Sequence, residues 1–390
     1  MKILIVCQYY YPEPFRITDI AENLVKLGNE VTILTGLPNY PEGKVSQEYK
    51  WGKRRNEFVN GVEIVRTFII GRRKGKIFLG LNYLSFIISS SLKMILLKKD
   101  FDTIFVYQLS PVFMAIPGIL YKKIRKKKLV LYCLDIWPAS LKAMNIPKES
   151  LIYKSVRYLS KAIYSQADSL LVSSKGFIAY LKNDLKIHKE IQYLPQYAED
   201  IYEEVTDENK SIEEYNLVFA GNVGKMQSVD TIIMAASFLK EKQNIKFHIV
   251  GDGSELQTCK KMASQLECGN VYFHGRVELK DVIKFYDIAD VLLLTLKDDE
   301  LINLTLPGKF QSYLAAGKPI VAAVNGEVAE EIRNAGCLVC GADDEKKLAE
   351  LILNQYHSNT TCNNREFYRL HYSKYAYLSK LLTIFADCVK

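Results

Sequence analysis

Lys309 stands where it can bind an anion. Residues 305–327 read in turn as loop, helix, glycine stop, buried strand and loop, and Lys309 falls in the first turn of that helix, close to Pro307. Unpaired backbone N–H groups and the helix dipole favour an anion at such a helix start. The stretch therefore predicts a phosphate site, and an ordinary connection between a helix and a strand is the alternative interpretation.

A second candidate for the same chemistry is the turn that follows the apolar strand 216–220. Gly221 and Gly224 would let a pyrophosphate approach the backbone, and Lys225 would neutralise its charge. The glycines lack the Gly-x-Gly-x-x-Gly spacing, and no acidic residue stands at a strand end about 20 residues later. A nicotinamide dinucleotide is therefore disfavoured.

Residues that could act on a hydroxyl group or contact a sugar follow other apolar strands. Asp135 ends the strand 128–135, where it can orient a hydroxyl group or accept its proton, and Trp137 comes shortly after it. Capping of the next turn is the alternative role of Asp135. The loop 35–44 is punctuated by proline and glycine, and its Asn39 and Tyr40 are of the types that hydrogen-bond to sugars or stack on them.

Positioning these residues requires two parallel sheets. Alternating strand and helix patterns begin at residue 2 and restart at 216, after a polar connector at 199–214. A chain of 390 residues with 48% hydrophobic and 25% charged residues is long enough for two such cores. We predict a first domain at 1–198, a second domain at 214–365, and a final helix at 366–390 that returns to the first domain.

The formal net charge of +8 comes from basic residues that bunch in the first half, around 72–76, 98–99 and 122–128. Such bunching suits an anionic membrane surface at least as well as nucleic acid. The first residues lead straight into a strand, so we expect no signal peptide.

Metal and disulfide chemistry are not indicated. Eight cysteines are too few for a disulfide scaffold in a chain of this length, so we expect reduced thiols and a cytosolic protein. Cys337 and Cys340 have the spacing of half a zinc site, but strand packing is the favoured interpretation. The acidic residues 298–300 read as a solvated loop.

Residues 77–97 form the most apolar stretch and are about as long as a bilayer crossing requires. Asn82, four serines and Lys93 interrupt the stretch, and basic residues flank both of its ends. Three interpretations stay open: a helix packed inside the domain, a helix lying in the membrane surface, and a true span.

Three segments resemble glycosyltransferase family 4, nucleotide-sugar enzymes of the GT-B fold. They are the Pro-x-Lys and Tyr-Leu-Ala-Ala-Gly-Lys-Pro-Ile patterns within 305–320, the Asp-Ile-Trp-Pro-Ala-Ser run at 135–140, and the Thr-Gly-Leu-Pro-Asn-Tyr-Pro run at 35–41. The last is similar to the WbuB-like branch of bacterial surface-polysaccharide enzymes. The resemblance implies an α/β protein with two Rossmann-like domains that face each other across a cleft.

Residue patterns and resemblance together assign roles to individual residues. Asp135, Lys225 and Lys309 are the catalytic candidates, and Asn39, Tyr40 and Trp137 are expected on the acceptor side. The donor-binding candidates are Arg16, Gly221, Asn222, Gly224, Gly251, Gly275, Arg276, Leu306, Pro307, Gln311, Ser312 and Glu327.

The chain departs from the family's pattern at three places. Most members place two glutamates eight positions apart, where this chain has Leu304 and Ser312, so the sugar and ribose contacts would move to residues such as Gln311 and Glu327. Most also carry a glycine pair after the first strand, where Arg16 would supply charge here. An arginine that often follows the first glycine of the second domain is replaced by Asn222.

The resemblance implies a retaining, metal-independent glycosyltransferase without a cofactor. It would move a sugar, with an N-acetylamino deoxysugar as one candidate, from a UDP-sugar to a lipid-linked or saccharide acceptor for O-antigen, capsule or exopolysaccharide. We expect a cytoplasmic protein, peripheral on the anionic inner face of the cell membrane, with no nucleic acid as partner. A nucleotide-sugar 2-epimerase of the same fold and a non-catalytic nucleotide-sugar-binding subunit are the rival hypotheses.

Overall fold

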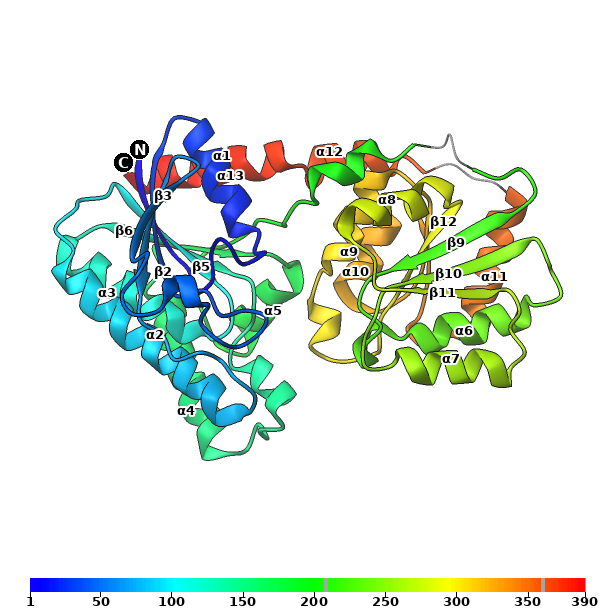
Figure 1. Cartoon of the computed structure of the whole chain (residues 1–390), viewed down its shortest axis with the longest axis horizontal. Helices are drawn as coiled ribbons and strands as arrows, with labels where there is room; N and C mark the ends of the chain where they lie inside the picture. Colours follow the sequence, from blue (N-terminus) through cyan, green and yellow to red (C-terminus); the bar gives the residue numbers. More distant parts are fainter. Residues whose placement is uncertain (207–209, 359–361, 390) are drawn as a thin grey trace. The chain divides into compact units, whose positions relative to one another are not determined.

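The structure, a computed structural model, describes residues 1–206, 210–358 and 362–389. The chain forms two compact α/β units (Figure 1). The first comprises Met1–Ser173, Phe177–Leu194 and Leu378–Lys390, and the second comprises Ser174–Gly176 and Pro195–Tyr377. The expectation of two α/β cores is confirmed, because each unit is built on its own largely parallel sheet.

The first unit contains an eight-stranded sheet in the order β3-β4-β2-β1-β5-β6-β7-β8. Strand β3 pairs antiparallel with β4, and the other neighbours run parallel. The strands are β1 (Lys2–Val6), β2 (Glu30–Gly36), β3 (Asn56–Val59), β4 (Val62–Thr67), β5 (Thr103–Gln108), β6 (Lys128–Cys133), β7 (Ser169–Val172) and β8 (Ile191–Tyr193).

Helices cover both faces of this sheet, which explains why its central strands are apolar without alternation. Phe105 of β5 contacts Phe385 on one face, with ring centroids 5.4 Å apart. The next residue, Val106, faces Gly118 on the other, where an added Cβ would lie 2.8 Å from the valine Cγ2. The helices of this unit are α1 (Ile17–Lys26), α2 (Lys76–Leu96), α3 (Ile116–Arg125) and α4 (Leu151–Ser165). Helices α5 (Lys175–Asn183) and α13 (Lys374–Val389) begin in the second unit and continue into the first.

The second unit contains a six-stranded parallel sheet in the order β11-β10-β9-β12-β13-β14. The strands are β9 (Tyr215–Ala220), β10 (Ile245–Val250), β11 (Val271–Gly275), β12 (Val291–Thr295), β13 (Ile320–Ala323) and β14 (Leu338–Cys340). Its helices are α6 (Val229–Phe238), α7 (Leu256–Gln265), α8 (Leu279–Ile288), α9 (Gly308–Ala316), α10 (Gly326–Asn334), α11 (Glu345–Ser358) and α12 (Asn364–His371).

Alternate residues of its central strands enter two separate cores. In β9, Leu217 and Phe219 pack with α6, α7 and α11, whereas Val218 and Ala220 pack with α8, α9, α10 and α12. Cys340 ends β14 and is buried in the first of these cores, as the strand-packing interpretation predicted.

Each sheet reverses its strand order at one point. In the first unit, β1 lies between β2 and β5, and in the second, β9 lies between β10 and β12. Open α/β sheets bind ligands at the carboxyl ends of the strands that flank such a reversal. The residues that follow β1 and β5 in the first unit, and β9 and β12 in the second, are therefore candidates for ligand contact.

Candidate functional site

Three strand ends of the second unit approach one another through glycines. The N–H of Gly221 donates to the carbonyl of Val250 (2.9 Å), and the N–H of Gly251 donates to the carbonyl of Gly275 (2.8 Å). A Cβ on Gly251 would lie 1.8 Å from the carbonyl oxygen of Gly221, and the φ angles of Gly221 and Gly251 are +146° and +139°. These turns can pack this closely only as glycines, which leaves bare backbone at the point where the sheet order reverses.

We call Gly221, Gly251 and Gly275 the glycine edge, and Lys309 lies against it at Gly221. It is the second residue of α9, after Pro307 at the N-cap position, as the pattern in the sequence predicted. Its Nζ is buried and has no hydrogen-bond partner among the described residues, and it lies 3.8 Å from the ring centroid of Phe219. A Cβ added to Gly221 would meet this Nζ at 3.3 Å.

Burial of the amine has an electrostatic consequence. Desolvation lowers the pKa of Lys309 from its ordinary 10.5 to about 7. The aromatic face of Phe219 offers a weak partner for a cation, but no carboxylate contacts the amine within the described chain. An anion beside the helix start would complete this site by pairing with the ammonium form.

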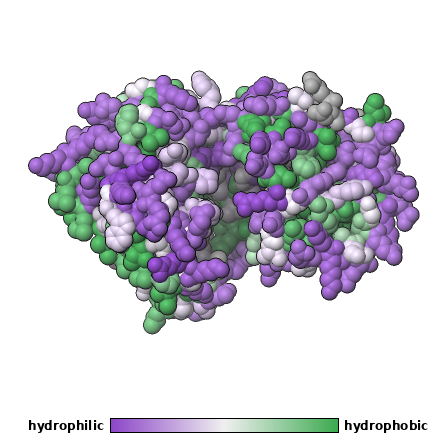
Figure 2. All heavy atoms as spheres, in the orientation of Figure 1, coloured by the Kyte–Doolittle hydropathy of each residue, from purple (hydrophilic) through white to green (hydrophobic). Residues whose placement is uncertain are grey.

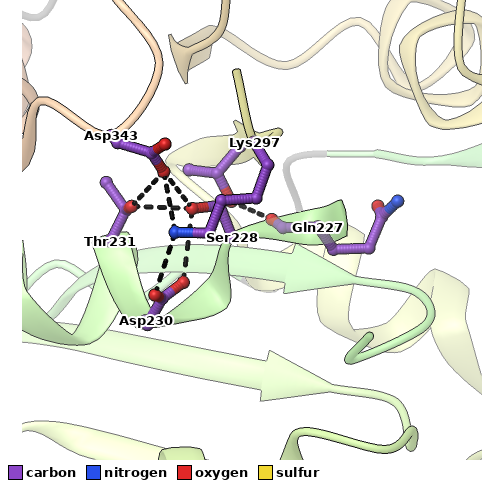
Figure 3. A network of polar contacts seen from close by, with 7 residues as sticks. Gln227, Ser228, Asp230, Thr231, Lys297 and Asp343 are labelled. Atoms are coloured by element: carbon purple, nitrogen blue, oxygen red, sulfur yellow. Dashed lines mark hydrogen bonds and ion pairs between the residues drawn. The ribbon is translucent and has the colours of Figure 1, made fainter. Parts of the chain in front are cut away.

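A polar network fixes the loop that follows β9 (Figure 3). Lys297, just after β12, contacts Asp230 (3.1 Å) and Asp343 (2.9 Å). Ser228 Oγ donates to the same Asp343 (2.7 Å), and Thr295 Oγ1 donates to the carbonyl of Gln227 (2.7 Å). The loops after β9, β12 and β14 are thereby tied together beside the reversal point.

The other donor-binding candidates of the second unit lie around this edge in varied environments. Asn222 and Lys225 are exposed in the loop after β9, and Gly224 approaches the Asn222 amide so closely that a Cβ would lie 2.6 Å from Nδ2. Arg276 is exposed directly after β11. Leu306 is half-buried just before α9. Their contacts to a donor stay predictions.

Ser312 occupies the position of the second family glutamate, and Gln311 precedes it. Both side chains are buried in α9. The Ser312 hydroxyl donates to the carbonyl of Lys309 (2.9 Å). With its amide nitrogen turned toward the start of the helix, Gln311 donates to the carbonyls of Pro307 (2.8 Å) and Gly308 (3.2 Å). Both side chains therefore brace the first turn that carries Lys309, which is a positioning role the sequence did not suggest.

Glu327 is also engaged within the second unit. Its carboxylate accepts hydrogen bonds from the backbone N–H groups of Lys175 (2.7 Å) and Gly176 (2.6 Å) and from the hydroxyl of Ser174. These three residues belong to the same unit as Glu327. Burial raises the pKa of Glu327 although these bonds act in the opposite direction.

In the first unit, polar residues gather at the ends of β1, β5 and β6. Val6 pairs with Val106, so Gln8 and Gln108 reach the same edge of the sheet. Each has a buried Oε1 without a hydrogen-bond partner in the described chain. The Nε2 of Gln108 donates to the carbonyl of Asp135 (2.9 Å).

Asp135 and Trp137, predicted for the acceptor side, contact each other. Trp137 Nε1 donates to Asp135 Oδ2 (2.9 Å) and to Ser110 Oγ (3.1 Å), and Ser140 Oγ donates to Asp135 Oδ1 (2.5 Å). The carboxylate thus organises its own turn, in keeping with the capping role. Its catalytic role stays a prediction.

Asn39 and Tyr40 belong to a second cluster of this edge. Asn39 is buried, and its Oδ1 accepts from the N–H of Arg72 (3.1 Å) and from Asn82 Nδ2 (3.3 Å). Tyr40 is partly exposed and packs its ring on Phe15, with centroids 5.3 Å apart. Arg16, the remaining candidate, stands at the N-cap position of α1.

The sequence analysis did not identify Glu13, whose carboxylate binds the backbone of the loop that contains Asn39 and Tyr40. Its Oε1 accepts from the N–H groups of Asn39 (2.8 Å) and Tyr40 (2.7 Å), and burial raises its pKa to about 7. It also missed Gln8, Gln108 and Asn82. The signal for the two glutamines was available, since each is a polar residue at the end of an apolar strand.

The fold and the two strand-end clusters define a GT-B protein, the class in which two Rossmann-like units are joined in one chain. Solved structures agree over nearly the full length: a crystal structure of HepE from Anabaena in complex with UDP and glucose shares 13% identity, covers 99% of each chain and superimposes with a TM-score of 0.67. A likeness at this identity concerns the fold.

Sequence comparison points the same way. Residues 214–358, in the second unit, match the family described as Glycosyl transferases group 1. A Pseudomonas aeruginosa protein named as a glycosyltransferase, WbjE, is 27% identical over 67% of this chain and 68% of its own. An Escherichia coli K12 protein named as a colanic acid biosynthesis glycosyl transferase, WcaI, is 22% identical over 81% and 82%.

The glycine edge should not tolerate a side chain at Gly251. We expect Gly251→Ala to lower the free energy of unfolding by about 2–4 kcal/mol, because the added Cβ collides with the Gly221 carbonyl and the backbone is strained. Urea unfolding measures this loss. Gly269→Ala is the matched control, since a Cβ there meets nothing within 4 Å; equal effects of the two substitutions would refute the close approach.

Lys309→Met should stabilise the unliganded protein. The substitution keeps the length of the side chain and removes a buried amine without a partner, so we expect a gain of about 1–4 kcal/mol at pH 7. Because the pKa of Lys309 is lowered in the folded state, unfolding takes up a proton between about pH 7 and 10.5. Its contribution to stability therefore rises with pH across this window.

The difference between wild type and Lys309→Met should consequently shrink as the pH rises from 7 to 10. Thermal unfolding over this range measures it, with the exposed Lys280→Met as control. A constant difference at all pH values would show that the amine is not desolvated.

Glu13→Gln should change stability in the opposite sense. The folded-state pKa of about 7 lies above the ordinary value of 4.5, so the contribution of Glu13 to stability falls as the pH rises through this window. Glutamine keeps the acceptor for Asn39 and Tyr40 without the charge. We expect the variant to be more stable than wild type at pH 8 and about equal at pH 5, whereas the exposed Glu42→Gln should change neither; an advantage that does not depend on pH would contradict the assignment.

Proposed function

We propose that the protein is a retaining glycosyltransferase that uses a UDP-linked sugar as donor. The observation that carries the proposal is Lys309, a buried amine at a helix start for which residues 1–206, 210–358 and 362–389 supply no counter-ion. It lies against a glycine edge where the sheet order reverses. A nucleoside diphosphate would provide a counter-ion for this amine. It could also approach the backbone closely, because the glycines carry no side chain. The Anabaena structure, described as a complex with UDP and glucose, supports a uridine nucleotide.

The chemistry follows from where charge develops. When the bond between the anomeric carbon and the diphosphate breaks, negative charge grows on the diphosphate oxygens. Lys309 and the first N–H groups of α9 would stabilise that charge in a desolvated setting, where one fixed donor or charge is worth about 10²–10³ in rate. Lys225, which is exposed in the loop after β9, would add a second cation.

The ammonium form of Lys309, once paired with the diphosphate, can take the part that a divalent cation plays in other transferases, so we propose that the reaction needs no metal ion. The test is turnover in the presence of EDTA. The proposed acceptor region is the strand-end cluster of the first unit, where Asp135 would accept the proton of the attacking hydroxyl and Asn39, Tyr40 and Trp137 would hold the acceptor sugar.

The names of the relatives extend the proposal to a pathway class. The Escherichia coli protein is named for colanic acid biosynthesis. Together with the WbuB-like pattern at 35–41 and the family 4 pattern at 305–320, this supports transfer of a sugar, with an N-acetylamino deoxysugar as one candidate. The acceptor would be a lipid-linked or saccharide acceptor of a cell-surface polysaccharide such as O-antigen, capsule or exopolysaccharide.

The proposal is tested by screening nucleotide sugars for thermal stabilisation of the purified protein and then analysing products with a crude lipid acceptor. Transfer with retention of the anomeric configuration is the expected result, read by NMR of the product. Conversion of the donor without an acceptor would favour the 2-epimerase instead. UDP binding without any turnover would favour the non-catalytic subunit.

Lys309→Met should lower donor turnover, and the affinity for UDP, by about a hundredfold, because it removes one preorganised charge. Isothermal titration with UDP and initial-rate measurements check the two effects. Lys280→Met, on an exposed surface of the same unit, should leave both unchanged. Unchanged values for Lys309→Met would remove the basis for the donor assignment.

A further inference from the structure

Helix α2 exposes its apolar side to the outside. Between residues 77 and 96, its outward positions recur every three or four residues and therefore lie on one face. Each of the large side chains on this face is between 38% and 79% exposed: Ile77, Leu81, Leu84, Ile88, Leu92, Ile95 and Leu96. After Lys76, the one charged residue of this helix is Lys93, which is half-buried.

The polar side of the same helix points inward and is bonded to the first unit. Asn82 is fully buried; its Nδ2 donates to the carbonyl of Ile70 (2.6 Å), and its Oδ1 accepts from Gln8 Nε2 (2.7 Å). Ser90 Oγ pairs with Thr67 Oγ1 (2.8 Å), and Ser85 Oγ accepts from the N–H of Ile70 (2.9 Å). A helix at a water-exposed surface has the reverse arrangement.

This arrangement favours one of the three interpretations of residues 77–97. The helix is long and apolar enough to cross a bilayer, and 22% of its most apolar window is buried. It is therefore not a core helix. A span would have to break the bonds of Asn82, Ser85 and Ser90, which hold the inner side to the unit, whereas a helix that keeps those bonds still offers its outer face to lipid.

The charge around the apolar face matches an anionic surface. Arg73 and Lys74 are exposed before the helix, and Lys98 is exposed after it. Helix α3 packs beside α2 and adds exposed Lys123, Ile124 and, just past its end, Lys126. Figure 2 shows hydrophobic side chains gathered on the side of the first unit where Figure 1 draws α2, α3 and α4.

Part of the basic run at 122–128 is occupied within the unit. Lys122 pairs with Asp168 (2.7 Å), and Lys127 pairs with Asp100 (2.9 Å). The exposed cations at the two ends of α2 are therefore better probes of lipid binding than this run.

We propose that the outer face of α2 docks on the surface of an anionic lipid bilayer, with the helix lying in the plane of the interface. The aliphatic stripe enters the boundary of the acyl chains, and the cations at its ends contact the lipid headgroups. This would hold the enzyme on the cytoplasmic face of the cell membrane. The inference stands on α2 alone and does not depend on the donor chemistry.

The experiment is flotation of the purified full-length protein with vesicles of phosphatidylcholine containing about one third phosphatidylglycerol, a proportion chosen to give an anionic surface. Wild type should float with these vesicles, more strongly at low salt. The triple variant Leu84→Gln, Ile88→Gln, Leu92→Gln should lose at least about tenfold in vesicle affinity, because the buried apolar area supplies much of the binding. Its melting temperature should be unchanged, since all three side chains point outward.

Two controls keep the test sharp. The triple variant Ile212→Gln, Phe238→Gln, Leu279→Gln removes exposed apolar side chains from the second unit and should float like wild type. Lys74→Gln with Lys98→Gln should weaken binding about tenfold or more to anionic vesicles and leave binding to pure phosphatidylcholine unchanged.

Wild type that stays unbound with anionic vesicles would overturn the proposal. So would sedimentation of wild type as a dimer that the Leu84, Ile88, Leu92 variant converts to monomer while vesicle binding is unaffected. That result would assign the face to a second copy of the chain.

Discussion

A single amine without a counter-ion constrains the second unit. The Lys309 amine is buried away from water because α9 begins beside Phe219 and because Gly221 leaves room for the end of the side chain. The residues around it maintain this arrangement: Gln311 and Ser312 brace the first helical turn, and Lys297, Asp230 and Asp343 fix the neighbouring loops. An apo protein that keeps such a charge gives up stability, a cost typical of sites prepared for a ligand.

The two units solve different problems with the same architecture. The second unit presents backbone and positive charge at its strand ends, which suits a compact anion. The first presents glutamine, asparagine and aromatic side chains at the corresponding place, including Gln8 and Gln108, whose carbonyl oxygens have no partner in the part of the chain that the structure describes. Such neutral groups fit hydroxyl-rich molecules. The contrast follows from the residues after each strand, because both sheets are largely parallel and reverse their strand order at one point.

Local patterns predicted the fold well. Pro307 and Gly317 bracket α9, and the unbroken apolar runs become central strands because helices cover both faces. The environment of each candidate could not be predicted in this way. The burial of Lys309 depends on Phe219 and Gly221, which are distant in sequence, and the role of Glu13 depends on two backbone groups of another loop. Asn82 and the serines of α2 read as interruptions of an apolar stretch until the structure showed which way they point.

The position of Asn82 has a mechanical consequence. This side chain connects the helix to Gln8 through its oxygen and to Asn39 and the carbonyl of Ile70 through its nitrogen. A displacement of α2 would therefore shift the loops that follow β1 and β2, because this amide group joins the helix to both of them.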